Sequence, residues 1–333
     1  MKSETAEEVL VKAETTTDPR YGCEPEKRNI KDYINNGIIN IDKPAGPSSH
    51  QVTAWVRDIL ELEKAGHSGT LDPKVTGVQP IALGNATKIV KILLLSEKEY
   101  VCLMSLHDKT SDEEIRKTIQ NFQGQIFQTP PVTSAVKREL RIRGIYEIKI
   151  IEKQDREILY RVRCEAGTYI RKLCHDIGLI LGTGAHMHEL RRTKTGTFDE
   201  TGLVTLQDLK DAYEFYKADG NETRLRKLIQ PVEAGVKNIK KIWVKDSSID
   251  ALCHGANLNA PGISKIQKDI RKNDPVAIMS LKNELVALGK AEATAEQMTQ
   301  MQKGTTAELV RVIMQPNTYP KAWRKKKTGD IRP

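Results

Sequence analysis

Residues 66–78 read Gly-His-Ser-Gly-Thr-Leu-Asp-Pro-Lys-Val-Thr-Gly-Val, and this stretch is the most informative in the chain. Three glycines and Pro73 surround a single acid, Asp72, so we expect an irregular loop from which the carboxylate projects. The order of its residues does not fit the G-x-x-x-x-G-K-[ST] pattern of a phosphate-binding loop. A carboxylate before proline is also typical of an Asx turn or a helix cap, so the loop alone leaves both a structural and a functional interpretation open.

The segments around this loop predict strands interrupted by helices. Residues 37–42 predict a short strand that ends in the turn cluster 43–47, and either Ser48 or Ser49 can cap the amphipathic helix that follows. Further along, apolar residues alternate from Tyr146 to Ile150 and again from Ile158 to Cys164, which predicts a hairpin. Together these patterns favour a mixed α/β (α+β) fold.

Two further stretches contain residues with chemical potential. Arg171 follows Gly167-Thr168 in the first turn of a predicted helix, where a cation opposes the helix dipole and calls for an anionic partner. The alternative is a solvated arginine on a helix face. Tyr100 enters the apolar run 101–104, where it cannot be distinguished from a core tyrosine by pattern alone.

Charge and cysteine content limit the classes of function. The 333 residues carry a net charge of +9, of which residues 29–320 contribute +6, so the excess is not only an effect of the basic tail 321–333. Such a charge is typical of a protein that binds nucleic acid, although an ordinary basic enzyme is an equal alternative. The five cysteines are scattered and never spaced as C-x-x-C. This argues against disulfides and structural zinc, and it favours a reducing compartment, which we expect to be the cytoplasm for an archaeal protein and the nucleolus for a eukaryotic one.

A change of texture near residue 240 predicts a second domain. Short apolar runs at 275–279, 285–289 and 309–314 are separated by turn residues, which is typical of a small β-barrel. The predicted organisation is an N-terminal arm (1–28), a large mixed α/β domain (29–240), a small β-barrel domain (241–320) and a basic tail (321–333). The arm is either flexible or a strand laid on the second domain.

Several of these stretches, in order and spacing, resemble successive motifs of the TruB-type pseudouridine synthases. The matching segments are residues 37–49, 66–78, 98–100, 130–137 and 167–173. Residues 182–193 are most similar to the dyskerin branch, the catalytic subunits of box H/ACA guide ribonucleoproteins, and to its archaeal members in particular. The resemblance covers roughly residues 30 to 320.

The resemblance implies roles for three catalytic residues. Asp72 matches the nucleophilic aspartate, Tyr100 the tyrosine that stacks on the flipped base and is a candidate for proton abstraction, and Arg171 the arginine that pairs with the aspartate. For an isomerisation that moves the glycosidic bond of uridine from N1 to C5, no cofactor and no metal are implied. Whether the aspartate attacks C1′ of the sugar, adds to C6 of the base or helps to form a glycal stays open, and our hypothesis is a glycal route in which Tyr100 or a bound water takes the C2′ proton.

Three more positions are implied around the substrate. Leu190 matches a leucine that lines the uracil pocket, and Lys43 and His67 fall on supporting motif positions. The sequence departs from the family pattern at Gln79, where an apolar residue is usual, and at residues 105–109. None of these departures touches the three catalytic positions.

The second domain resembles the RNA-binding PUA domain over residues 253–263 and 269–274, with Asn273 in place of a frequent glycine. The resemblance implies that one turn-rich segment faces the 3′ ACA element of a guide RNA, the alternative being a plain barrel rim. The residues implied are Gly255, Ala256, Ala260, Pro261 and Gly262.

The partners implied by the family are a box H/ACA guide RNA, a substrate RNA, a small zinc-ribbon protein, a small β-barrel protein and a kink-turn-binding protein, with no membrane. Two alternatives remain within RNA binding: a stand-alone tRNA pseudouridine synthase and a non-catalytic RNA scaffold. A metal-dependent nuclease is disfavoured because the sequence lacks a clustered set of carboxylates or histidines.

Overall fold

The computed structural model describes residues 8–130 and 137–321. The chain divides into two compact units, one formed by residues 34–230 and the other by the residues before and after that range. Most of the motif segment 130–137 and of the basic tail 321–333 lies outside the described residues.

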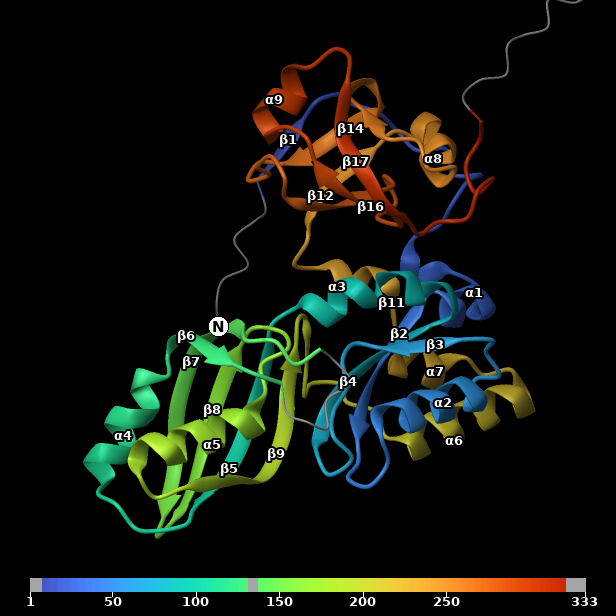
Figure 1. Cartoon of the computed structure of the whole chain (residues 1–333). Coiled ribbons are helices and arrows are strands. Elements are labelled where there is room, and N and C mark those ends of the chain that lie inside the picture. Colours follow the sequence, from blue (N-terminus) through green and yellow to red (C-terminus); the bar gives the residue numbers. More distant parts are fainter. Residues whose placement is uncertain (1–7, 131–136, 322–333) are drawn as a thin grey trace, which may run out of the picture. The chain divides into compact units, whose positions relative to one another are not determined.

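The larger unit is built on a ten-stranded sheet with the order β11-β2-β4-β9-β5-β8-β7-β6, to which β10 and β3 add at β9 and β4 (Figure 1). The sheet is mixed, because β4 pairs with β9 in parallel fashion while the pairs β2–β4, β9–β5 and β5–β8 are antiparallel. The strands are β2 (Gly37–Lys43), β3 (Ala65–His67), β4 (Thr76–Leu83), β5 (Lys98–Leu106), β6 (Gly124–Gln128), β7 (Arg141–Gln154), β8 (Glu157–Cys164), β9 (Ala185–Thr195), β10 (Phe198–Asp199) and β11 (Ile229–Pro231).

Helices cover this sheet where their apolar faces match it. Helices α4 and α5 pack on the half formed by β5 to β9 and share one apolar core with it, as Figure 1 shows. In the other half of the unit, α2 packs against α6. The helices of this unit are α2 (Ser49–Ile59), η2 (Gly84–Ile89), α3 (Val90–Leu95), α4 (Asp112–Asn121), α5 (Ile170–Leu181), α6 (Leu206–Asp219) and α7 (Thr223–Leu228), and α1 (Ile30–Asn35) spans the division between the two units.

The structure decides which of the two candidate serines caps helix α2. Ser48 is the N-cap of α2, and it forms a capping box in which its side chain accepts from the backbone of Gln51 while the Gln51 side chain binds back. Ser49 is the first helical residue, and its hydroxyl is free to serve another segment. The predicted start of this helix is therefore confirmed within one residue.

The predicted hairpin is confirmed as β7 and β8, but Tyr146, the first residue of the alternating run, does not share the buried face of Ile148. A register shift between Ile145 and Glu147 interrupts the alternation along β7. As a result Ile145 and Ile148 are buried and Tyr146 is 44% exposed. A β-bulge changes which face each later residue occupies, and no local pattern announces it.

The smaller unit holds a seven-stranded sheet with the order β1-β14-β12-β15-β16-β17-β13 and its own apolar core. Strand β1 pairs with β14, so the N-terminal segment contributes a strand at residues 9–11. The elements are β1 (Val9–Val11), η1 (Pro25–Lys27), η3 (Val232–Val236), β12 (Lys240–Val244), α8 (Asp246–Cys253), β13 (Leu258–Asn259), η4 (Ala260–Gly262), β14 (Ile263–Gln267), β15 (Pro275–Met279), β16 (Leu285–Ala291), α9 (Ala295–Gln300) and β17 (Thr305–Val312). The predicted fold class, a mixed α/β body with a small β-rich second part, is confirmed.

Candidate active site and RNA-binding pocket

Asp72 lies in the loop that joins β3 to β4, two strands that pair with each other in antiparallel fashion. Inside the loop the amide of Val75 donates to the carbonyl of Asp72 at 3.0 Å. Leu71 and Val75, on either side of the acid, are 4% and 2% exposed and belong to the apolar core. The loop is therefore irregular as predicted, and it is anchored on both sides of the carboxylate.

Two buried side chains hold this loop by its backbone. The Ser49 hydroxyl accepts from the Leu71 amide at 2.8 Å and donates to the Leu71 carbonyl at 3.2 Å. The Lys43 ammonium donates to the carbonyls of Pro73 at 3.0 Å and Val75 at 2.8 Å, and to that of Pro44. Lys43 is 0% exposed, and its ammonium holds the backbone on both sides of Lys74 in the loop. Sequence reasoning missed Ser49, although it lies inside a quoted motif.

His67 also supports the loop. Its Nδ1 accepts from the amide of Gly69 at 3.3 Å, and its ring meets that of His50 edge to face with 4.7 Å between centroids. Burial, and then the neighbouring His50 and Arg192, lower the pKa of His67 to about 4. The imidazole is therefore neutral at physiological pH and holds the backbone as a hydrogen-bond acceptor.

Asp72 and Arg171 meet as the sequence predicts. Arg171 is the second residue of α5, and its Nη2 donates to Oδ2 of Asp72. The two side chains are 49% and 52% exposed, so both charges are open to solvent and to a ligand. A pair this exposed contributes little to stability, which leaves function as its main consequence.

Tyr100 lies on β5 and is 9% exposed. It belongs to the same apolar core as Leu71 and Val75, which lie on either side of Asp72 in the chain. The partly buried Leu190, which the resemblance places in the uracil pocket, packs against this core. Burial raises the pKa of the Tyr100 phenol, while the positive charge of Arg192 acts in the opposite direction. The structure therefore brings Tyr100, Leu190 and the Asp72 loop together.

The departure at Gln79 has a structural reason. Gln79 is 0% exposed on β4, and its Nε2 donates to the Ser49 carbonyl at 3.0 Å and to the Thr53 hydroxyl at 3.4 Å. An amide there ties β4 to the start of α2, so a polar residue replaces apolar packing without leaving its donor unpaired.

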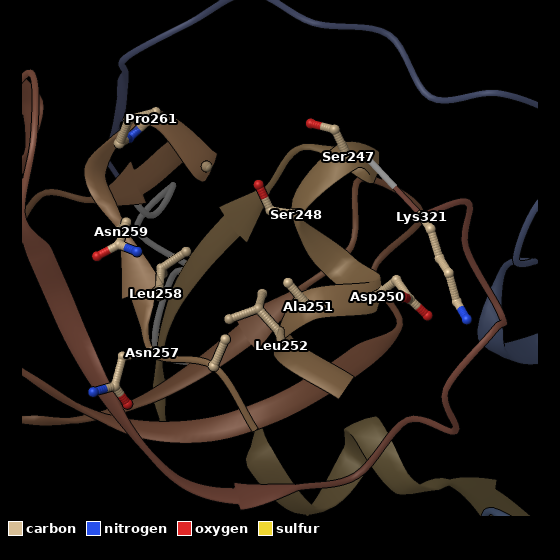
Figure 2. A pocket seen from close by; sticks show the side chains of 12 residues that line it. Ser247, Ser248, Asp250, Ala251, Leu252, Asn257, Leu258, Asn259, Pro261 and Lys321 are labelled. Carbon is tan, nitrogen blue, oxygen red and sulfur yellow. The ribbon is translucent and has the colours of Figure 1, made fainter. Parts of the chain in front are cut away.

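The smaller unit holds a pocket of about 550 Å³ between α8 and the segment through β13 and η4 (Figure 2). Three of the five predicted RNA-binding residues line it: Ala256, Pro261 and Gly262. Gly255 is exposed but does not line it, and Ala260 is 0% exposed and packs in the interior. The full lining is Ser247, Ser248, Asp250, Ala251, Leu252, Ala256, Asn257, Leu258, Asn259, Pro261, Gly262 and Lys321.

Sequence reasoning missed the polar side of this pocket, which α8 and Lys321 supply. The signal was the polar start of the helix at Asp246–Ser248. The expectation for Asn273 is confirmed, since its φ of +73° is a conformation that asparagine tolerates.

Other site types find no support within residues 8–130 and 137–321. No group of three histidine, cysteine or acidic side chains there could hold a metal ion. No helix in these ranges is long and apolar enough to cross a membrane. All five cysteines are free, as expected from their spacing, and the compartment stays a prediction.

Four family models match consecutive parts of the chain. They are the DKCLD domain (residues 3–53), the N-terminal domain of the TruB family pseudouridylate synthases (57–170), the C-terminal domain of tRNA pseudouridylate synthase B (171–237) and the PUA domain (240–313). A relative in Methanopyrus kandleri, described as probable tRNA pseudouridine synthase B, is 55% identical over 97% of this chain and 96% of its own length. The chain belongs to the TruB family of pseudouridine synthases.

Other relatives of this TruB family enzyme agree. A protein of the same description in Archaeoglobus fulgidus is 53% identical over 96% of this chain and 98% of its own length. A solved chain from a Cbf5-Nop10-Gar1 complex is 52% identical, with a TM-score of 0.90 over 96% of this chain and 97% of that one. Another, from an H/ACA RNP bound to a substrate RNA, is 50% identical with a TM-score of 0.89 over 95% and 97%. The resemblance to the archaeal dyskerin branch and the prediction of a pseudouridine synthase are confirmed.

Proposed function

We propose that this TruB family enzyme isomerises uridine to pseudouridine at positions that a box H/ACA guide RNA selects. The observation that carries the chemistry is the half-exposed Asp72 carboxylate paired with Arg171 beside Tyr100. Guide dependence is supported by the similarity, over nearly the whole chain, to solved proteins from H/ACA complexes.

Each catalytic side chain has a role that its surroundings permit. The target uridine must leave its helix to reach Asp72, and stacking on the Tyr100 ring offsets part of that cost. The Asp72 carboxylate then acts on the nucleotide as the nucleophile, oriented by the guanidinium of Arg171. In the glycal route that we favour, Asp72 bonds to C1′ as uracil leaves with the N1–C1′ electron pair. Breaking the C2′–H bond then forms the C1′=C2′ double bond as the bond between C1′ and Asp72 breaks and its electron pair returns to the carboxylate. The proton goes to the Tyr100 oxygen in its phenolate form or to a bound water.

We infer that the pocket of the smaller unit binds the 3′ ACA element of the guide. Ala256 and Gly262 carry at most a methyl group that would keep bases from the backbone, and Pro261 adds a compact apolar ring. The rim offers hydroxyl, amide and charged groups. We also propose that the large domain spans residues 29–240, that the RNA-binding domain spans residues 241–320, and that the protein acts in the cytoplasm.

We propose partners of three kinds for the assembled particle. Proteins like the Nop10 and Gar1 of the similar Cbf5 complex would provide the small zinc-ribbon and β-barrel components. A kink-turn-binding protein would be reached through the guide RNA. A stand-alone tRNA synthase is the second candidate, favoured by the description of the curated relatives as probable tRNA pseudouridine synthase B.

The deciding experiment measures pseudouridine in one rRNA fragment and one tRNA, each with and without a matching H/ACA guide, using wild-type protein and Asp72→Asn. We expect guide-dependent product on the rRNA fragment and a loss of at least about 1,000-fold in Asp72→Asn. Equal product without guide on the rRNA fragment would overturn guide dependence, and full activity of Asp72→Asn would overturn the nucleophile.

A further inference from the structure

Arg192 is a fully buried cation at the point where the two halves of the large sheet meet. It is 1% exposed and lies on β9, opposite Tyr100 of β5 on one side and Gly77 of β4 on the other. Gly77 permits this close approach, because its φ is +103° and a Cβ there would lie 2.2 Å from the Arg192 carbonyl oxygen.

The guanidinium donates to two backbone carbonyls near the active site. Its Nε donates to the Val78 carbonyl at 2.7 Å, and both terminal nitrogens lie 3.4 Å from the carbonyl of Gly69 in the loop before Asp72. Arg192 is also the cross-strand partner of Tyr100, because β9 pairs with β5 in a register that sets these two residues opposite each other. Arg192 therefore links the catalytic tyrosine to the segment that carries the catalytic acid.

No carboxylate within the described residues lies within salt-bridge distance of Arg192. Its neighbours Lys43 and His67 are themselves nitrogen bases, and the charge of Lys43 repels it. Burying a guanidinium without an anionic partner is unfavourable compared with an apolar side chain of similar volume. Negative charge that develops beside Arg192 during the reaction would offset this cost.

Tyr100 is the group on which that charge would develop. The ionisable groups that face it are Arg192 from β9, Cys164 from β8 and Asp72 from the β3–β4 loop. Of these, Arg192 is the one that favours the phenolate, while burial, Cys164 and Asp72 favour the neutral phenol.

We propose that Arg192 is a positioning residue that acts on the reaction through Tyr100. It holds the phenol oxygen in place and stabilises the phenolate that accepts the C2′ proton. This inference rests on the proposed role of Tyr100 in proton transfer. After Asp72 has bonded to C1′ and uracil has left, Tyr100, which has lost its own proton to solvent water, takes the C2′ proton. The electron pair of that C–H bond becomes the C1′=C2′ bond as the Asp72 carboxylate leaves C1′. The proton returns to C2′ when C5 of the uracil anion bonds to C1′, and C5 then loses its proton to solvent while N1 gains one.

The test is the single-turnover rate on guide-bound substrate from about pH 6 to 9 for Arg192→Met, Arg192→Lys, Tyr100→Phe and the double variant Arg192→Met/Tyr100→Phe. We expect Arg192→Met to be slower by at least about 30-fold at pH 7 and its pH profile to move up by about one unit or more. Arg192→Lys should lie between it and the wild type. The residual rate of Tyr100→Phe should not change further when Arg192→Met is added.

The matched control is Arg191→Met, which removes a partly exposed cation on the same strand that pairs with Asp42 and Glu200. Its pH profile should stay that of the wild type. A folded Arg192→Met that is slower by one factor at every pH would reduce Arg192 to a structural role and overturn the inference. If Tyr100→Phe keeps the wild-type pH profile, the proton-transfer role of Tyr100 in the proposed function fails instead. If Arg192→Met does not fold, Arg192→Lys decides the question through its own profile and its additivity with Tyr100→Phe.

Discussion

The guanidinium of Arg171 donates a hydrogen bond to the carboxylate of Asp72 although 99 positions separate the two residues in the chain. The first turn of α5 supplies the cation and an irregular loop before β4 supplies the anion. Because both side chains are about half exposed, a nucleotide can reach the carboxylate from solvent without displacing buried residues.

This geometry predicts a rate effect without a stability effect. Arg171→Gln should lower kcat by about 100-fold, since it removes the donor that orients the nucleophile. Arg171→Lys should recover part of the rate, because an ammonium keeps the charge but not the planar geometry. The free energy of unfolding should change by less than about 0.5 kcal/mol in both variants.

The control for this prediction is Lys172→Gln, which removes the neighbouring helical cation that pairs with Asp176. It should retain a kcat near that of the wild type in the same guided assay. An Arg171→Gln enzyme with more than half of the wild-type kcat would contradict the assigned role.

The anchoring of the loop by Ser49 gives a second prediction. Ser49→Ala leaves the Leu71 amide and carbonyl without their buried partner, which should cost about 1 to 3 kcal/mol of stability and lower kcat by about 10- to 100-fold. Ser111→Ala, which removes the N-cap of α4, should cost about 1 kcal/mol and leave kcat unchanged. Equal losses of kcat in the two variants, measured together with urea unfolding, would show that lost stability alone explains the effect.

The lowered pKa of His67 gives a pH dependence of stability. Its folded-state pKa of about 4 is below the ordinary value of 6.5, so the unfolded chain binds more protons between these pH values and stability falls as the pH drops through this window. The full effect of this one group is about 3 kcal/mol as an upper bound.

In His67→Gln this part of the acid sensitivity should be lost. Denaturant unfolding at about pH 7 and pH 4.5 should therefore show a smaller stability difference than in the wild type. His175→Gln, which removes a 55% exposed imidazole, should behave like the wild type. Parallel losses in wild type and His67→Gln would rule out the buried neutral imidazole.

The pocket of the smaller unit predicts a separate RNA contact. Ala256→Glu places a carboxylate in the pocket and should weaken binding of an H/ACA guide by at least about 10-fold, because it repels phosphate and occupies space. Val11→Glu makes the same change of charge on an exposed strand at the opposite end of the sheet and should leave affinity within about twofold. Affinities that fall equally in both variants would point to net charge and away from the pocket.

The local elements of this protein could be predicted because their signals are contiguous. The capping motif at Ser48, the apolar face from Ile170 to Ile177 and the glycine-rich loop around Asp72 each depend on residues a few positions apart. The family motifs are contiguous in the same way, so they and the catalytic residues that they imply could also be recognised from the sequence.

The tertiary structure alone decided which of these residues support and which can react. Lys43 and Arg192 are both buried cations whose donors bind carbonyls of the loop around Asp72, and only strand pairing across the sheet places them there. A bulge in β7 exposes Tyr146, and Ala260 packs inward while its neighbours line a pocket. These outcomes depend on register and on pairings between distant segments. The free energy of burial that fixes them is a property of the assembled sheet. The sequence by itself therefore determined which chemical groups the protein has, and the fold determined where each group acts.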